Sequence, residues 1–101
     1  MIVYNVTVNV EPEIHDEWVV WMKQYHIPDV LQTGMFTSYK MLRLLNEEPN
    51  NTGTTYAIQY YCSNLNDLQR YLEEYAPKLQ REHSEKYSGK FVAFRTFLQE
   101  V

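Results

Sequence analysis

The feature that most restricts the fold is a weak repeat between the two halves of the chain. Each half contains a helical pattern with an internal proline, Pro28 in the first half and Pro77 in the second. Each pattern stops at a glycine and passes into a strand through the tripeptide Gly-x-Phe, at 34–36 and again at 89–91. The sequence therefore predicts two copies of one unit, in which a strand, a helix and another strand follow one another.

Alternation of residue types marks the strands. In the first ten residues the even positions from Ile2 to Val10 are apolar or aromatic, which is the pattern of a half-buried strand. Bulky and apolar residues predict further strands over 36–45, 54–62 and 91–98. The stretch 46–53 consists of turn-forming residues and predicts an exposed loop.

The first predicted helix begins at Pro12, because proline suits the first helical position. Its apolar stripe repeats at steps of three and four and comprises Ile14, Trp18, Trp21, Met22 and Tyr25. We expect the pair Ile27-Pro28 to interrupt this helix, because a proline ring disfavours helical geometry at the residue before it. One further turn would follow, closed by Gly34 in the left-handed conformation.

The second predicted helix is capped by Ser63 or Asn64. Its apolar stripe comprises Leu68, Tyr71, Leu72, Tyr75, Leu79 and His83. Pro77 lies inside the stripe and predicts a kink at residues 74–76. A glycine, Gly89, ends the helix before the last strand.

The resulting order is β-α-β-β-α-β. Two such split units assemble as a four-stranded antiparallel sheet with both helices on one face, so we predict an α+β, ferredoxin-like fold and a single domain over residues 1–101. The last strand carries large apolar groups on both faces, and the face without helices would expose one set of them. Pairing of two sheets face to face would bury this set, and we therefore expect a homodimer through the open sheet face.

Composition excludes several classes of function. Thirteen acidic and nine basic residues give a net charge of −4, without the basic stripe of a nucleic-acid binder. No apolar run approaches the roughly 20 residues that span a bilayer, and no signal peptide is visible, so we expect no membrane partner and a cytoplasmic location. The single Cys62 and the spacing of the three histidines match no metal site, and we expect no metal and no cofactor.

Four motifs carry a resemblance to a known family: Tyr4-Asn-Val-Thr-Val-Asn-Val10, Trp18-x-x-Trp21 followed by His26-Ile-Pro28, Gly34-x-Phe36, and Lys90-Phe-Val-Ala-Phe-Arg95. With these motifs the whole chain resembles the short bacterial proteins catalogued as domain of unknown function 4286. That family is similar in architecture to dimeric α/β barrels, a superfamily that includes cofactor-independent monooxygenases, haem-degrading enzymes and small isomerases. The resemblance implies the dimeric fold, and it assigns no activity to this chain.

The catalytic candidates are His26 and His83. His26 lies at the Ile27-Pro28 break, where an imidazole could act as acid or base in a cleft, or could bond the carbonyl groups freed at the helix end. His83 extends the apolar stripe of the second helix and lies at the edge of the core, as a functional or a structural histidine. The resemblance implies a comparison with haem-degrading enzymes, in which a histidine of the second helix binds iron and an asparagine of the first strand assists. His83 and Asn5 have comparable places here, but the sheet tryptophan of those enzymes has no counterpart.

Five residues are candidates for ligand binding: Asn5, Trp21, Gln59, Tyr75 and Arg95. Asn5, Tyr75 and Arg95 would line a pocket between helix and sheet with His83. Trp21 belongs to an aromatic helix face, which serves either a flat ligand or the core. Gln59 and Arg95 would be neighbours if both occupy the open sheet face, where they could bind a carboxylate of a ligand or of the partner protomer.

Two classes of function remain open. The first is a small homodimeric protein that binds a small molecule in the helix–sheet cleft. The second is a cofactor-independent monooxygenase or isomerase acting on an aromatic or quinone-like substrate, with a histidine as base. Haem binding through His83 is a third option.

Overall fold

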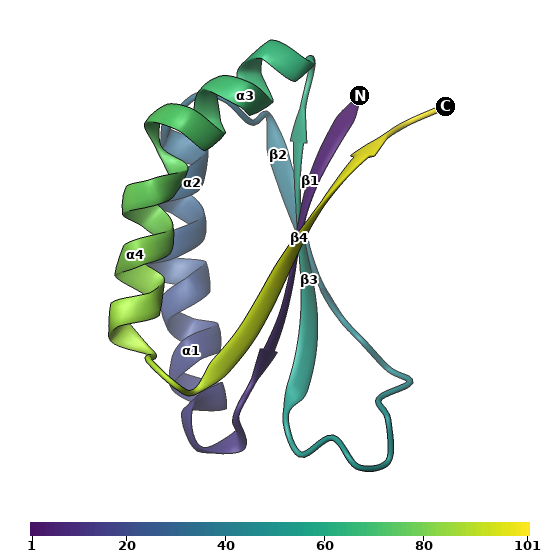
Figure 1. The fold of residues 1–101 in the computed structure, drawn as a ribbon, viewed down its shortest axis with the longest axis vertical. Coiled ribbons are helices and arrows are strands. Elements are labelled where there is room, and N and C mark those ends of the chain that lie inside the picture. The colour runs from purple at the N-terminus through teal and green to yellow at the C-terminus, as the bar shows by residue number, and fades with distance from the viewer.

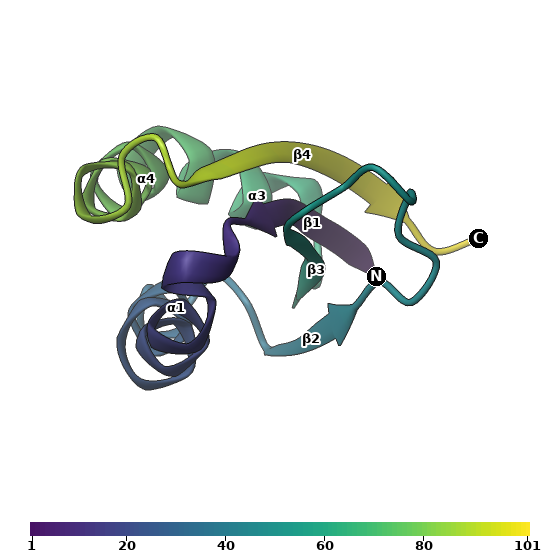
Figure 2. The same ribbon diagram turned by 90° about the horizontal axis from the view of Figure 1, so that it is seen from below.

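The computed structural model describes residues 1–101 and contains one four-stranded sheet. Its strands are β1 (Ile2–Val10), β2 (Ser38–Arg43), β3 (Thr54–Cys62) and β4 (Phe91–Gln99). Their order is β2-β3-β1-β4, and every neighbouring pair is antiparallel. All helices cover the same face of the sheet, as Figures 1 and 2 show from two directions. The predicted α+β, ferredoxin-like arrangement is confirmed, although β2 is shorter than the predicted strand over 36–45.

The first helical segment runs through four consecutive elements. They are the 3₁₀ turn η1 (Pro12–Ile14), α1 (His15–Trp21), the π-helical turn η2 (Met22–His26) and α2 (Ile27–Gln32). The predicted interruption at Ile27-Pro28 is wrong, because the backbone stays helical through both residues. Instead the helix widens ahead of the proline, and the N–H of Ile27 donates to the carbonyl of Met22, five residues back.

The proline explains why the helix widens at η2. Pro28 has no N–H to donate, and in an α-helix its ring would meet the carbonyl of Gln24, four residues back. A π-helical turn lengthens the spacing between the hydrogen-bonded residues and relieves this conflict without ending the helix. The segment ends as predicted at Gly34, whose φ of +80° is the left-handed conformation that glycine adopts without strain.

The second helical segment is divided as the sequence predicts. Helix α3 (Leu65–Glu74) and helix α4 (Ala76–Lys86) meet at Tyr75, within the predicted kink. The side-chain oxygen of Asn64 accepts a hydrogen bond of 2.9 Å from the backbone N–H of Asp67, so Asn64 is the N-cap of α3. None of the helices is long and apolar enough to span a membrane.

The core lies between the helices and the sheet. The even-numbered residues of β1 and β3 face the helices, and Tyr4 and Tyr60 belong to an aromatic cluster with Phe36 and Tyr71. The rings of Phe36 and Tyr71 pack edge to face with centroids 4.8 Å apart. This cluster fixes both helical segments to the sheet, because Phe36 follows the first segment and Tyr71 belongs to the second.

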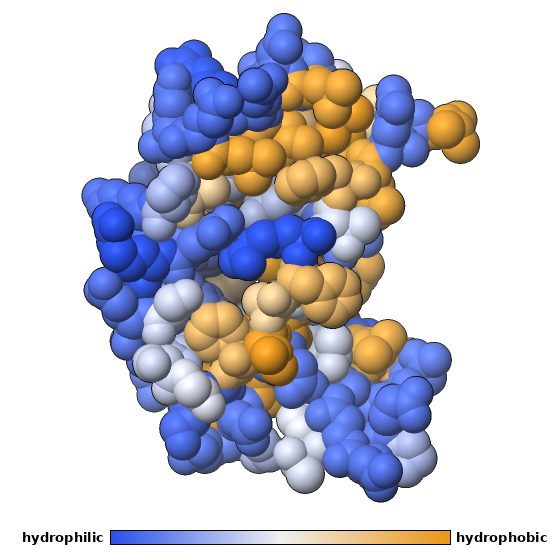
Figure 3. Space-filling view, viewed as in Figure 1, coloured by the Kyte–Doolittle hydropathy of each residue, from blue (hydrophilic) through white to orange (hydrophobic).

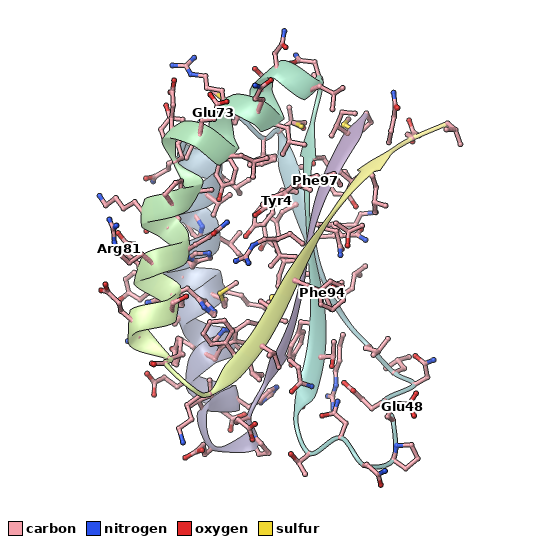
Figure 4. The ribbon with its side chains drawn as sticks, viewed as in Figure 1. Tyr4, Glu48, Glu73, Arg81, Phe94 and Phe97 are labelled. Carbon is pink, nitrogen blue, oxygen red and sulfur yellow. The ribbon has the colours of Figure 1, made fainter.

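The opposite face of the sheet has no helix over it. Its exposed apolar side chains come from the two edge strands and are Leu42, Val92, Phe94 and Leu98. Figure 4 shows Phe94 on this face and Tyr4 on the helix side. In Figure 3 the outer side of the helices is largely hydrophilic, whereas apolar atoms gather along β4 and beyond the sheet. We call the sheet face opposite the helices, on which Leu42, Val92, Phe94 and Leu98 are exposed, the open face.

Candidate functional site

A small cavity lies between the helices and the sheet. It encloses about 30 Å³ and is lined by side chains of η2, α2, α3 and α4 and of the three strands β1, β3 and β4. Most of its walls are apolar, and its polar lining includes His26, Gln80, His83 and Arg95. We call this cavity the helix–sheet cleft. It brings both predicted histidines and the predicted arginine together.

His83 is held in the cleft by a tryptophan. The indole N–H of Trp18 donates a buried hydrogen bond of 2.8 Å to Nε2 of His83. The imidazole also packs against the ring of Phe91, with centroids 4.2 Å apart. Burial lowers the pKa of His83 to about 4, and the charges of His26 and Arg95 act in the same direction. His83 is therefore neutral near pH 7.

His26 lies beside His83, and the centroids of the two rings are 5.7 Å apart. The π-helical turn η2 carries it, and its ring stacks on Trp21 at 5.1 Å. Burial lowers its pKa to about 4, against the opposing charge of Asp29 on the next turn. Its Nδ1 is buried and has no hydrogen-bond partner, so it does not bond the carbonyl groups of the helix end. An orphaned buried nitrogen of this kind is costly unless another molecule satisfies it.

Arg95 reaches the cleft from β4. It is paired in register with Val6 and therefore faces the helices, where it borders the cleft with its side chain exposed. It makes no hydrogen bond or salt bridge within the chain. It lines the same cavity as both histidines, and its charge lowers the pKa of each.

Asn5 and Gln59 do not contribute to this cleft. They are direct cross-strand partners on the open face, so the predicted pairing of Gln59 with Arg95 is wrong, as is the predicted place of Asn5 in the helix–sheet pocket. The strand register explains both errors. Arg95 lies opposite Val6 and belongs to the residues that face the helices, whereas Asn5 and Gln59 belong to the residues of the other sheet face. Oδ1 of Asn5 is buried without a partner, while its Nδ2 donates to the hydroxyl of Thr7 at 3.0 Å.

The other two predicted ligand-binding residues lie beside the cleft. Trp21 packs behind the histidines, with its ring centroid 5.8 Å from that of His83. Tyr75 stacks on Tyr71 and borders a separate surface groove between the helices. Tyr71, one turn earlier on α3, lines the cleft instead.

Tyr4 and Gln80 also line the cleft and were not among the residues predicted for the site. Trp18 was not predicted for the site either, and it acts from outside the lining through its hydrogen bond to His83. The Nε2 of Gln80 donates to the hydroxyl of Tyr4 over a long 3.5 Å. The apolar stripes mark Trp18 and Tyr4 as buried, but a stripe does not reveal the polar atom that each buried ring must satisfy. Gln80 carries no sequence signal, because single glutamines on helix surfaces are common.

The donor groups do not fit a metal or a haem. No three His, Cys, Asp or Glu side chains are placed to hold a metal ion. The Nε2 lone pair of His83 accepts from Trp18, so the ring nitrogen that most often binds iron is engaged. Cys62 is a buried free thiol whose pKa burial raises. Haem binding through His83 thus loses its support.

The sequence and the fold were compared with known proteins. The whole chain, residues 1–101, matches the family described as "Domain of unknown function (DUF4286)". No curated protein matches the sequence.

Several solved structures share the fold. An EthD family protein from Bacillus halodurans is 17% identical with a TM-score of 0.67, covering 100% of both chains. SnoaB, a cofactor-independent oxygenase from Streptomyces nogalater, is 10% identical with a TM-score of 0.61, covering 98% of this chain and 92% of its own. A dimeric ferredoxin-like protein from an uncultured marine organism is 14% identical with a TM-score of 0.56, covering 99% of this chain and 98% of its own. At these identities the likeness establishes the fold alone.

Proposed function

Because the chain belongs to the DUF4286 family, whose description names no activity, we propose a function from the site itself: the protein is a homodimer of single-domain protomers, residues 1–101, that binds a small molecule in the helix–sheet cleft. One observation carries the proposal. Two neutral histidines and an arginine without a counter-ion converge on a single cavity with apolar walls. Few, convergent polar groups in an apolar concavity are typical of ligand sites.

The size of the cleft sets a condition on the ligand. A volume of about 30 Å³ accommodates a water molecule or two. A ring-sized molecule therefore enters only if side chains at the mouth move. Arg95 is exposed and unbonded, and the single contact of Gln80 with Tyr4 is long, so these two side chains can move at little cost. Our proposal therefore requires Arg95 and Gln80 to move aside when a ligand enters.

The open face supports the homodimer. Phe94 and Val92 are 63% and 71% exposed on a sheet face that no other element covers. Oδ1 of Asn5 is buried at the centre of this face and lacks a donor in its own protomer. A second copy packed sheet to sheet would bury the apolar side chains and could supply the missing donor.

Native mass spectrometry of freshly purified protein tests both parts of the proposal. We expect a dimer that carries extra mass, absent from the denatured chain. Ala93→Leu fills the cleft, because Ala93 lines it, and should release that mass. Val20→Leu enlarges an apolar side chain that is exposed on α1, away from both the cleft and the open face, and should retain it. Recovery of a bare monomer would contradict the dimer, and retention of the mass by Ala93→Leu would contradict the site.

A second candidate function is a cofactor-independent monooxygenase or isomerase on an aromatic or quinone-like substrate. The neutral imidazole of His26 favours it, because a neutral ring with a free lone pair can take a proton from a substrate, whereas the Nε2 lone pair of His83 is engaged by Trp18. A pKa of about 4 makes His26 a weak base at neutral pH, which ranks catalysis below binding. An enzyme of this kind should lose turnover of the co-purified molecule in His26→Gln while the dimer persists. Undiminished turnover in His26→Gln would contradict a catalytic role for this histidine.

A further inference from the structure

We propose that the helix–sheet cleft takes an organic oxyanion, such as a carboxylate or phenolate, and that Trp18 is the positioning residue that makes His83 a hydrogen-bond donor to it. This inference rests on the proposed ligand site and names the chemical class of its ligand. Three features of the cleft carry it: the tautomer of His83, the uncompensated charge of Arg95, and the absence of acidic side chains from the lining.

The hydrogen bond from Trp18 determines the tautomer. An indole N–H can only donate, so Nε2 of His83 must be the acceptor and cannot carry a proton. A neutral imidazole holds one proton, and in His83 that proton is consequently on Nδ1. Nδ1 makes no hydrogen bond within the chain, although His83 lines the cleft. We therefore assign the Nδ1–H of His83 as a donor available to a ligand in the cleft, and the ring has no free acceptor.

The charge of the cleft is positive. Arg95 is its only ionised lining group near neutral pH, since both histidines are neutral and no Asp or Glu lines it. Asp29, whose charge acts on His26, borders the separate surface groove beside Tyr75 and does not line the cleft. A guanidinium next to apolar walls attracts an anion more strongly than it would in bulk water.

The two donors select one kind of ligand atom. The N–H groups of Arg95 and the Nδ1–H of His83 both require an acceptor, and an anionic oxygen satisfies both with charge-assisted hydrogen bonds. A neutral amide offers an oxygen of similar size without the charge. A cation would face Arg95 with like charge and leave both donors without an acceptor.

The first test measures the tautomer in the absence of ligand. In ¹⁵N NMR of the imidazole side chains, Nδ1 of His83 should have the shift of a protonated nitrogen and Nε2 that of an unprotonated one. Trp18→Phe keeps a ring but removes the donor, and should move the proton partly or wholly to Nε2. Trp21→Phe is the matched control, because Trp21 contacts the same ring without a hydrogen bond, and should leave the tautomer unchanged. Trp18 is fully buried, and Trp18→Phe lowers the stability of the fold because the smaller ring leaves a gap. The wild-type spectrum alone still decides, since a proton on Nε2 overturns the role of Trp18.

The second test uses benzoate, benzamide and benzylammonium as probes of one shape and three charges. Benzoate should shift the side-chain resonances of Arg95 and His83, and the other two should not. Arg95→Met should weaken benzoate binding roughly tenfold or more, the effect of losing a charge-assisted hydrogen bond. Arg95→Lys should restore part of it. Arg81→Met removes a cation that points outward from α4 and should have no effect (Figure 4).

The outcomes separate this inference from the proposed function. Equal binding of benzoate and benzamide, or equal binding by wild type and Arg95→Met, overturns the oxyanion preference and leaves a small-molecule site in place. Failure of all three probes to perturb the cleft also overturns it, while the proposed function is then judged by the co-purified mass. The oxyanion preference and the proposed function are both contradicted only if the purified protein carries no extra mass and none of the three probes binds.

Discussion

At the scale of residues, His26 and His83 are neutral groups that the fold keeps from being protonated. Both have a pKa of about 4 in the folded chain, because burial disfavours the charged ring, against about 6.5 in the unfolded chain. As the pH falls through this window, the unfolded chain binds protons that the folded chain does not. Their contribution to stability is thus complete above about pH 6.5 and lost towards pH 4.

We accordingly predict that the free energy of unfolding falls by about 1.4 kcal/mol per pH unit for each histidine between about pH 6.5 and 4. Urea titrations at several pH values in this window measure the slope. His83→Gln and His26→Gln should each make it shallower relative to wild type, whereas Gln32→Ala, at an exposed residue without a titratable group, should not. A slope unaffected by the two cleft substitutions would contradict the burial of neutral rings.

Sequence reasoning identified several residues of the site, but it did not predict the contacts that these residues make. The apolar stripe placed His83 at the core edge, and the structure agrees. Its partner Trp18 lies 65 positions away, and no local pattern reveals such a pair. Two places remained open for Arg95, the helix–sheet pocket and the open face, because the last strand is apolar on both sides. Alternation shows which residues share a face without showing which face meets the helices.

At the scale of elements, the π-helical turn η2 sets the direction of His26. Sequence reasoning identified the conflict that Pro28 creates and predicted a break. The structure resolves the conflict differently, since tertiary packing of the buried Met22, Ile27 and Val30 holds the helix together across the proline. The kink in the second helix was predicted correctly, because Pro77 lies at the start of α4, where its missing N–H breaks no helical bond.

Pro28→Ala should change the site through this element. Alanine restores an N–H that can bond the carbonyl of Gln24, and the wide turn should then tighten to an α-helix. His26 would rotate relative to the cleft, and its pKa should rise from about 4 towards 6.5 as the ring becomes hydrated. An NMR titration of His26 measures this shift. The matched variant Pro77→Ala, in the other helical segment, should leave the pKa of His26 unchanged. An unchanged pKa of His26 in Pro28→Ala as well would show that the π-helical turn does not control the environment of this histidine.

At the scale of the whole molecule, the sheet has one face that packs against the helices and another that no element covers. The topology, the open face and, to within one residue, the limits of β1, β3 and β4 were predicted from alternation and from the repeat, because these depend on patterns within the chain. The packing of the cleft and the positions of the side chains at its mouth were not predicted, because they depend on how side chains from several elements meet.

A charge on the open face should separate the protomers. Phe94→Glu would place a carboxylate in the proposed interface and remove a large apolar side chain, and should raise the dimer dissociation constant roughly a hundredfold or more. Light scattering after size-exclusion chromatography measures the mass. Tyr25→Glu is the matched control, because Tyr25 is 58% exposed on the helical side, and should remain dimeric. A dimer that survives Phe94→Glu would place the interface elsewhere.

The buried thiol of Cys62 gives the molecule a chemical reporter of its own motions. It is the only cysteine in the chain, it is fully buried at the end of β3, and its Sγ donates to the carbonyl of Asn64 just before α3. A thiol reagent can reach it only when the junction of β3 and α3 opens, so the labelling rate measures the frequency of that opening without any engineered probe. A ligand that binds only the closed fold should slow labelling in proportion to its occupancy.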